Sequence, residues 1–113
     1  MADNKIHIRT VTIPVGATAP TDVVDLNDLV LVGIITPPTV AGSSLSFFGA
    51  GGNTALNKVY DSEGDAVAVA IGANRFIALS PTLLAGVTKV RIISNAAASG
   101  SPEEYDLVLR EIN

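Results

Sequence analysis

Apolar and β-branched residues occur in short runs along this chain, and turn residues separate the runs about every 8–12 positions, a pattern typical of β-sandwiches and β-barrels. About nine runs read as strands, at 5–13, 22–26, 29–35, 44–48, 57–61, 66–71, 75–79, 88–93 and 105–112. None of the intervening segments is long enough for a helix that connects parallel strands. The pattern therefore predicts an all-β fold, an antiparallel β-sandwich of jelly-roll or Greek-key type, as a single domain over residues 1–113.

Two connections have recognisable turn chemistry. Residues 57–61 and 66–71 are expected to form a hairpin across residues 62–65, where Gly64 supplies a positive φ. A single short helical turn is expected near residues 81–85, because Ser80 is a suitable N-cap and Pro81 suits the first helical position.

The run 29–35 is apolar at every position. A strand that is apolar on both faces is either covered on both sides or uses one face for an assembly contact. We predict that Leu29, Leu31 and Ile34 contribute to such a contact. Residues 1–5 are a candidate extended arm for the same purpose, although a frayed terminus explains them equally well. The arm residues proposed as contacts are Ala2, Asp3, Asn4 and Lys5.

Composition strengthens the expectation of covered surface. Charged residues make up 16% of the chain, against about 25% in an average soluble domain. Hydrophobic residues make up 48%, and the mean hydropathy is +0.44. Small neutral side chains facing water would explain these values, but coverage by partner subunits is the favoured explanation, because large exposed apolar patches usually mark interfaces.

Charge and hydropathy also exclude partners. The net charge is −4, and the seven Lys and Arg residues are scattered, so the basic stripe needed for nucleic-acid binding is missing. The longest apolar run falls short of the roughly 18 residues of a membrane helix. The polar first residues lack the pattern of a secretory signal. We expect no nucleic-acid or membrane partner, and synthesis in a cytoplasm.

The residue inventory offers no catalytic, cofactor or metal site. The chain has no cysteine and one histidine, His7, which alternates with apolar residues beside Lys5 and Arg9 and is predicted to lie on the surface. Thiolate sites, three-histidine metal sites and a serine triad are thereby excluded or unsupported. We therefore expect that the protein is not an enzyme and holds no cofactor.

Two acidic clusters are predicted to be solvated. Residues 61–65 resemble a calcium loop, but the twelfth position counted from Asp61 is Gly72, where an EF-hand needs a bidentate Glu. Glu103, Glu104 and Asp106 are expected at the solvated entrance of the last strand.

Aromatic residues limit a carbohydrate-binding function. The chain has no Trp, and Phe47 and Phe76 fit inward strand positions. Phe48, Tyr60 and Tyr105 remain as candidate platforms for a sugar. A glycan- or surface-binding module is accordingly the alternative function.

Several short motifs lie within residues 11–94. They are VDL at 24–26 followed by LVGIITP at 31–37, VYDSEG at 59–64, and RFIALSP at 75–81 with LAGVTKVR at 84–91. In order and spacing, these motifs resemble a group of small proteins encoded among the structural genes of tailed bacteriophages. Related chains often end an aromatic-rich strand in an Asp-Gly turn, where this chain has Phe47-Phe48-Gly49. No ligand-binding residue is therefore carried over.

The resemblance implies a virion component, a decoration (cement) protein that sits on the outer surface of the capsid. Its expected partners are the major capsid protein and further copies of itself, as a dimer or trimer. Such a protein stabilises the shell by contacts repeated over many copies, and it needs no active site.

Overall fold

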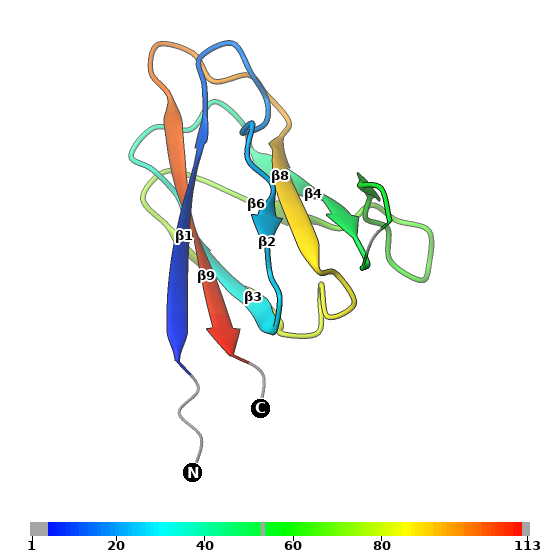
Figure 1. Cartoon of the computed structure of the whole chain (residues 1–113). Helices are drawn as coiled ribbons and strands as arrows, with labels where there is room; N and C mark the ends of the chain where they lie inside the picture. The colour runs from blue at the N-terminus through cyan, green and yellow to red at the C-terminus, as the bar shows by residue number, and fades with distance from the viewer. Residues whose placement is uncertain (1–4, 53, 112–113) are drawn as a thin grey trace.

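The structure, a computed structural model, describes residues 5–52 and 54–111, and over these residues the chain forms nine strands in two antiparallel sheets (Figure 1). Each predicted run overlaps one of the strands, although β4, β8 and β9 extend beyond their predicted bounds, and the predicted all-β sandwich is confirmed. The strands are β1 Ile6–Ile13, β2 Val24–Asp25, β3 Leu29–Ile35, β4 Ser44–Ala50, β5 Asn57–Lys58, β6 Ala68–Ala70, β7 Phe76–Ala78, β8 Lys89–Ser94 and β9 Glu103–Glu111.

The chain is folded back on itself as one long antiparallel ribbon. β1 pairs with β9, β2 with β8, β3 with β7, and β4 with both β5 and β6. Successive pairs alternate between the sheets, which gives the orders β1-β9-β3-β7 and β2-β8-β4-β5, with β6 also on β4. A ribbon wrapped in this way is a jelly roll, which decides between the two predicted topologies.

The expected hairpin between residues 57–61 and 66–71 forms only at its tip. Tyr60 and Ala66 make an isolated antiparallel bridge, whereas β5 and β6 both pair with β4, at Phe48 and Leu45 respectively. They share one edge of β4 end to end, because this seven-residue strand offers a longer row of backbone partners than the two short strands offer each other. Residues 60–66 are thus a loop inserted in an interrupted edge strand.

A β-bulge in β3 sets which of its side chains face the core. Leu31 pairs with Leu109, but Gly33 pairs with Val108, so Val32 is an extra residue. An extra residue shifts the inside–outside alternation by one position. Leu31 and Ile34 therefore both point inward although they are three residues apart, and both are buried.

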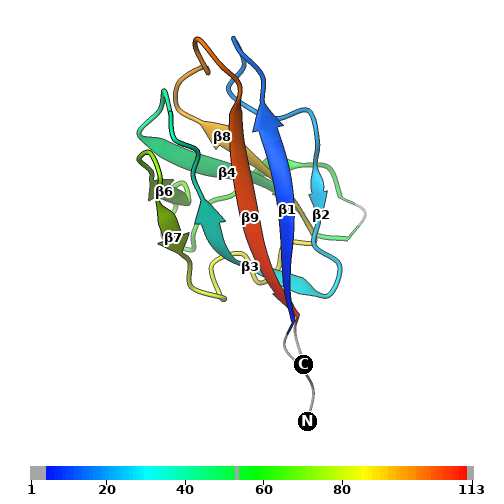
Figure 2. The ribbon, with the colours of Figure 1, turned by 90° about the vertical axis from the view of Figure 1, so that its left-hand side faces the viewer.

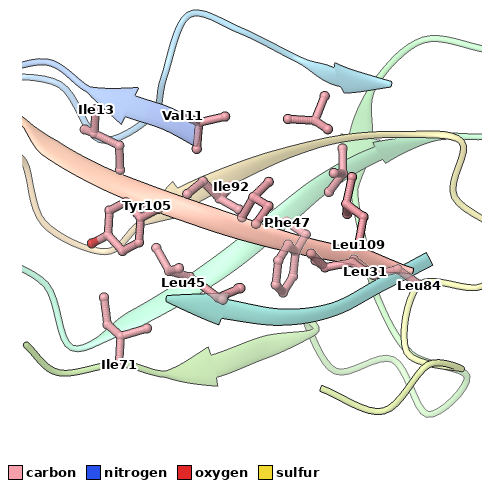
Figure 3. Packing of buried hydrophobic residues seen from close by; sticks show 14 of the residues in the cluster. Val11, Ile13, Leu31, Leu45, Phe47, Ile71, Leu84, Ile92, Tyr105 and Leu109 are labelled. Atoms are coloured by element: carbon pink, nitrogen blue, oxygen red, sulfur yellow. The ribbon is translucent and has the colours of Figure 1, made fainter. Parts of the chain in front are cut away.

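The core lies between the two sheets. Figure 3 shows side chains from both sheets meeting there, with Phe47 of β4 and Tyr105 of β9 among the largest that are fully buried. Phe47 was predicted to point inward, and this is confirmed. Phe76 was also expected inside, but it is 63% exposed. The strand β7 alternates Phe76 and Ala78 with Ile77, and pairing with β3 turns Ile77 inward instead.

The segment 80–86 is a series of turns and not the expected helical turn. The N–H of Leu83 donates to the Ser80 carbonyl and that of Val87 to the Leu84 carbonyl, both at 3.0 Å. These bonds do not follow one another residue by residue, as a helix requires. Leu84 is 4% exposed, so core packing holds the segment. The described part of the chain contains no helix that could cross a membrane.

Two phenylalanines that the sequence does not distinguish should differ sharply in their effect on stability. We expect Phe47→Ala to lower the free energy of unfolding by about 3–5 kcal/mol, because it leaves a cavity in the core. Phe76→Ala should cost about 1 kcal/mol or less, as for most surface changes. Urea denaturation monitored by circular dichroism measures both values, and equal losses would contradict the placement of Phe76.

Candidate interaction surface

The outer face of the β1-β9-β3-β7 sheet carries a cluster of apolar side chains. Alternate residues of a strand point to opposite sides, and Tyr105, Leu107 and Leu109 of β9 face the core. The residues that alternate with these three along β9 face outward, and so do the residues of β1 and β3 that pair with them. The residues of β7 that pair with the outward residues of β3 face the same way. We call the apolar members of this set the outer apolar face: Ile6, Ile8, Val30, Val32, Ile35, Phe76, Ala78 and Val108.

No described segment covers this face. Figure 2 looks onto it, and β1, β9 and β3 lie in front of the second sheet with nothing drawn across them. Phe76, Ile6 and Ile8 are 63%, 55% and 47% exposed. Val30, Val32 and Ile35 are half-buried, and Val108 is 5% exposed, so the most exposed apolar side chains lie on the two edge strands of the sheet. Large apolar side chains exposed together on one side of a small domain often mark an interaction surface.

A glycine positions the most exposed ring of the face. Gly33 on β3 lies opposite Ala78 of β7, next to Phe76. A Cβ at Gly33 would lie 3.0 Å from two ring carbons of Phe76, which is tighter than ordinary van der Waals contact. The missing side chain therefore allows the ring to lie directly over the β3 backbone.

Among the described residues, β9 contributes three charged side chains to the same side of the sheet. Glu104 and Asp106 are the outward residues at one end of β9, and Arg110 is the outward residue at the other. The Thr10 hydroxyl donates to the Asp106 carboxylate at 2.6 Å. The row between them, with Ile8 opposite Val108, is uncharged. Arg110 lies between Ile6 and Val30, and Asp106 lies between Thr10 and Ile35. The face therefore combines one uncharged row with two rows that each contain a charged residue of β9.

The predicted interface residues on β3 are not on this face. Leu31 and Ile34 are 2% and 0% exposed, and Leu29 is half-buried against the core. That prediction is wrong for Leu31 and Ile34, because the bulge turns both inward. β3 does carry apolar side chains on its outer side, but they belong to Val30, Val32 and Ile35.

The N-terminal candidates are placed only in part. Lys5 is exposed, at the start of β1, and its carbonyl accepts the N–H of Glu111 at 3.1 Å. Ala2, Asp3 and Asn4 lie outside the described residues, so an extended arm over residues 1–5 stays a prediction.

A buried acid–phenol pair lies at one end of the core. Glu103 is 2% exposed and Tyr105 is fully buried. The Tyr105 hydroxyl donates to Glu103 Oε1 at 2.9 Å, and the Ala41 N–H donates to Glu103 Oε2 at 2.8 Å. The pair ties the loop before β4 to β9. Burial raises the pKa of the Tyr105 hydroxyl above its ordinary value of 10.0, and the hydrogen bond and negative charge of Glu103 raise it further.

This pair overturns two expectations. Glu103 was expected to be solvated with Glu104 and Asp106, but it faces the core opposite Ile13; Glu104 is exposed, as predicted, and Asp106 is half-buried. Tyr105 was a candidate sugar platform, yet its ring is inside. The alternation of positions 103, 105, 107 and 109 along β9 was the sequence signal that would have placed both residues inward.

Two further polar features involve β1. A hollow of about 380 Å³ runs between β1 and β2, and it is lined by Arg9, Thr10, Val11, Asp22, Val23, Val24, Asp25 and Asn27. Its carboxylates belong to Asp22 and Asp25 and its hydroxyl to Thr10, and its lining includes no histidine, serine or cysteine. His7 lies outside it, half-exposed as predicted for a surface residue, with Nε2 2.8 Å from Glu111 Oε2.

The acidic loop 61–65 is a solvated tip, as predicted. Asp61 Oδ1 accepts the N–H groups of Glu63 and Asp65 at 2.9 and 3.0 Å, and Gly64 has φ +89°. The Asp61 carboxylate thus stabilises the turn. Within residues 5–52 and 54–111, no three His, Cys, Asp or Glu side chains are grouped so that they could hold a metal ion.

Comparison of the chain with known protein families, with curated proteins and with solved structures gave no match.

Tyr105→Phe should change both the level of stability and its dependence on alkaline pH. At neutral pH we expect a loss of about 1–3 kcal/mol, because one buried oxygen of Glu103 loses its donor. Above about pH 10 the wild-type free energy of unfolding should fall, because the unfolded chain releases the Tyr105 proton while the folded chain retains it. The other titratable groups contribute equally in both proteins, so the variant should lack the part of the decrease in the free energy of unfolding that comes from Tyr105. Urea unfolding at a series of pH values measures it, and parallel curves for the two proteins would contradict the assignment.

Proposed function

We propose that this chain is a structural virion protein, a capsid decoration (cement) protein that binds the outer surface of the shell and stabilises it through contacts with shell subunits. The observation that carries the proposal is the outer apolar face, which carries the large exposed side chains Ile6, Ile8 and Phe76 on a sheet held by a packed core. The resemblance of its motifs to small structural proteins of tailed phages supports the same function.

The size of the face fits a contact that is repeated many times. Four strands about 4.8 Å apart, with about seven residues rising about 3.3 Å each, cover roughly 19 by 23 Å. This footprint is smaller than the roughly 800 Å² that each partner contributes to a standard interface. A single contact of this size is weak, so it acts best where a shell presents the same site in many copies and where linked copies bind together.

The alternative, a glycan- or host-surface-binding module, retains two of its three rings. Tyr60 is 56% exposed, with the Lys58 ammonium 6.0 Å from the ring centre, and Phe48 is half-buried on the outer side of the second sheet. These residues belong to the opposite side of the sandwich from the outer apolar face. The two functions would therefore use different surfaces, so substitutions can test them separately.

Phe76→Lys should weaken binding to the shell, and Tyr60→Lys should not. Both side chains are more than half exposed, so neither change should unfold the protein. We expect Phe76→Lys to weaken binding about tenfold or more, because placing a charge in an apolar contact forfeits roughly the 1.5–3 kcal/mol of a buried large side chain. Cosedimentation of purified protein with capsids assembled without it measures the binding.

Two results would contradict the proposal. One is no binding of the wild-type protein to the shell, together with no matching density on purified particles in electron microscopy. The other is loss of binding in Tyr60→Lys with Phe76→Lys unaffected. Specific binding of wild type to a glycan array, abolished by Tyr60→Lys, would establish the alternative.

A further inference from the structure

The four edges of the two sheets differ greatly in length. β7, at one edge of the first sheet, has three residues, and β2, at one edge of the second, has two. The opposite edge of the second sheet is divided between β5 and β6, which have two and three residues. β1 alone, among the described edges, is long, with eight residues. Short and interrupted edges resist pairing with other chains, whereas a long edge strand invites it.

The hydrogen-bond pattern identifies the free groups on β1. Glu111 N–H donates to the Lys5 carbonyl, and residues opposite each other in an antiparallel pair alternate between bonded and non-bonded. Lys5 and every second residue after it therefore bond to β9. The backbone N–H and C=O groups of the intervening residues point away from β9, toward the open edge of the sheet. These residues are Ile6, Ile8, Thr10 and Thr12.

The strand is well suited to accept another strand. Six of its eight residues are β-branched, and it contains neither Pro nor Gly. The four residues with outward backbone groups are exposed. A hollow lined by Arg9, Thr10 and Val11 on one side and by residues 22–27 on the other lies beside this edge, so part of the space next to β1 is open.

We propose that β1 pairs antiparallel with β1 of a second copy of this chain, so that the two four-stranded sheets join into one sheet across a two-fold axis. The interface is isologous, since the same edge serves both copies, and two-fold dimers are the commonest closed assemblies. This dimer does not depend on the proposed capsid function.

Charge selects the register of the pairing. The free backbone groups lie on even-numbered residues, so the even-numbered residues of one copy must lie opposite those of the other. A two-fold axis at Ile8, Arg9 or Thr10 meets this condition. An axis at Arg9 sets Arg9 opposite its own copy, and an axis at Ile8 sets Arg9 opposite the basic His7. An axis at Thr10 sets Arg9 opposite Val11, so no like charges face each other. Like charges directly opposite each other destabilise a cross-strand pair. The axis at Thr10 also ends the pairing where Pro14 lacks an N–H.

Joining the edges in this register has a consequence for the outer apolar face. The two faces become neighbouring parts of one continuous sheet surface, with Ile8 of each copy beside Thr12 of the other. The apolar area available to a common partner doubles, although no residue of either face is consumed by the pairing. A dimer would therefore bind a repeating surface through two sites at once.

Thr10→Pro tests the proposal, with Thr10→Val as its matched control. Proline at position 10 removes an N–H that points away from β9, so the bonds within the sheet are kept. In the dimer it removes both central hydrogen bonds, and we expect the dimer to weaken about tenfold or more. Thr10→Val loses the same hydroxyl but keeps the N–H, so it should dimerise like wild type. Sedimentation velocity over a wide concentration range distinguishes the 11.6 kDa monomer from a species of twice that mass.

A second pair of variants tests the register and does not depend on proline. Thr10→Lys and Thr10→Glu should each be monomeric, because like charges would face each other across the axis. A mixture of the two should recover the dimer, because opposite charges then face each other. Recovery is specific to an axis at Thr10, and failure of the mixture to recover the dimer would overturn the register.

Amide exchange provides a readout that other dimers would not give. In the monomer, the amides of His7, Arg9 and Val11 should be protected, while those of Ile8, Thr10 and Thr12 exchange rapidly. In the dimer, the second set should become protected as well. A wild-type chain that stays monomeric, a Thr10→Val variant that dissociates like Thr10→Pro, or a dimer without this added protection would each overturn the proposal.

Discussion

β9 pairs along both of its edges, with β1 on one side and β3 on the other, and the rest of the first sheet depends on these two ladders. The pairing joins the ends of the described chain, since His7 and Glu111, 104 positions apart, lie within hydrogen-bond distance. Closing such a long loop costs conformational entropy before any contact offsets it. The offset comes from Leu107 and Leu109, which β9 inserts into the core. Without β9, neither β1 nor β3 would have a long partner.

The same strand explains why the molecule has an exposed apolar side. Because alternate residues of β9 face opposite ways, the residues that fill the core are interleaved with Val108 and its outward neighbours. β1 and β3 repeat this arrangement on either side. Jelly rolls bury one face of each sheet, and the chain supplies no helix among its described residues to cover the other. The chain as a whole has few charged residues, 16%, and this side of the sandwich is the surface that we propose is covered by protein.

The sequence predicted the strands well and the orientation of side chains less well. Each run of β-branched and apolar residues became a strand, because this signal is local. The orientation of Phe76 and of Leu31 depended on a pairing register and on a bulge, which involve residues far apart in the chain. Glu103 was misplaced because its two hydrogen-bond donors, Ala41 and Tyr105, include one on a distant loop. From the sequence, only the run 29–35 was expected to have an apolar outer side. Because this run is apolar at every position, its periodicity could not show which of its residues face outward.

We propose that the outer apolar face is covered by protein when the molecule acts. Hydroxyl-radical footprinting of the free protein and of the protein bound to capsid particles measures this directly. We expect Phe76 and Ile35 to become protected on binding, while Tyr60, on the opposite side of the sandwich, keeps its reactivity. Unchanged reactivity of Phe76 together with protection of Tyr60 would contradict it.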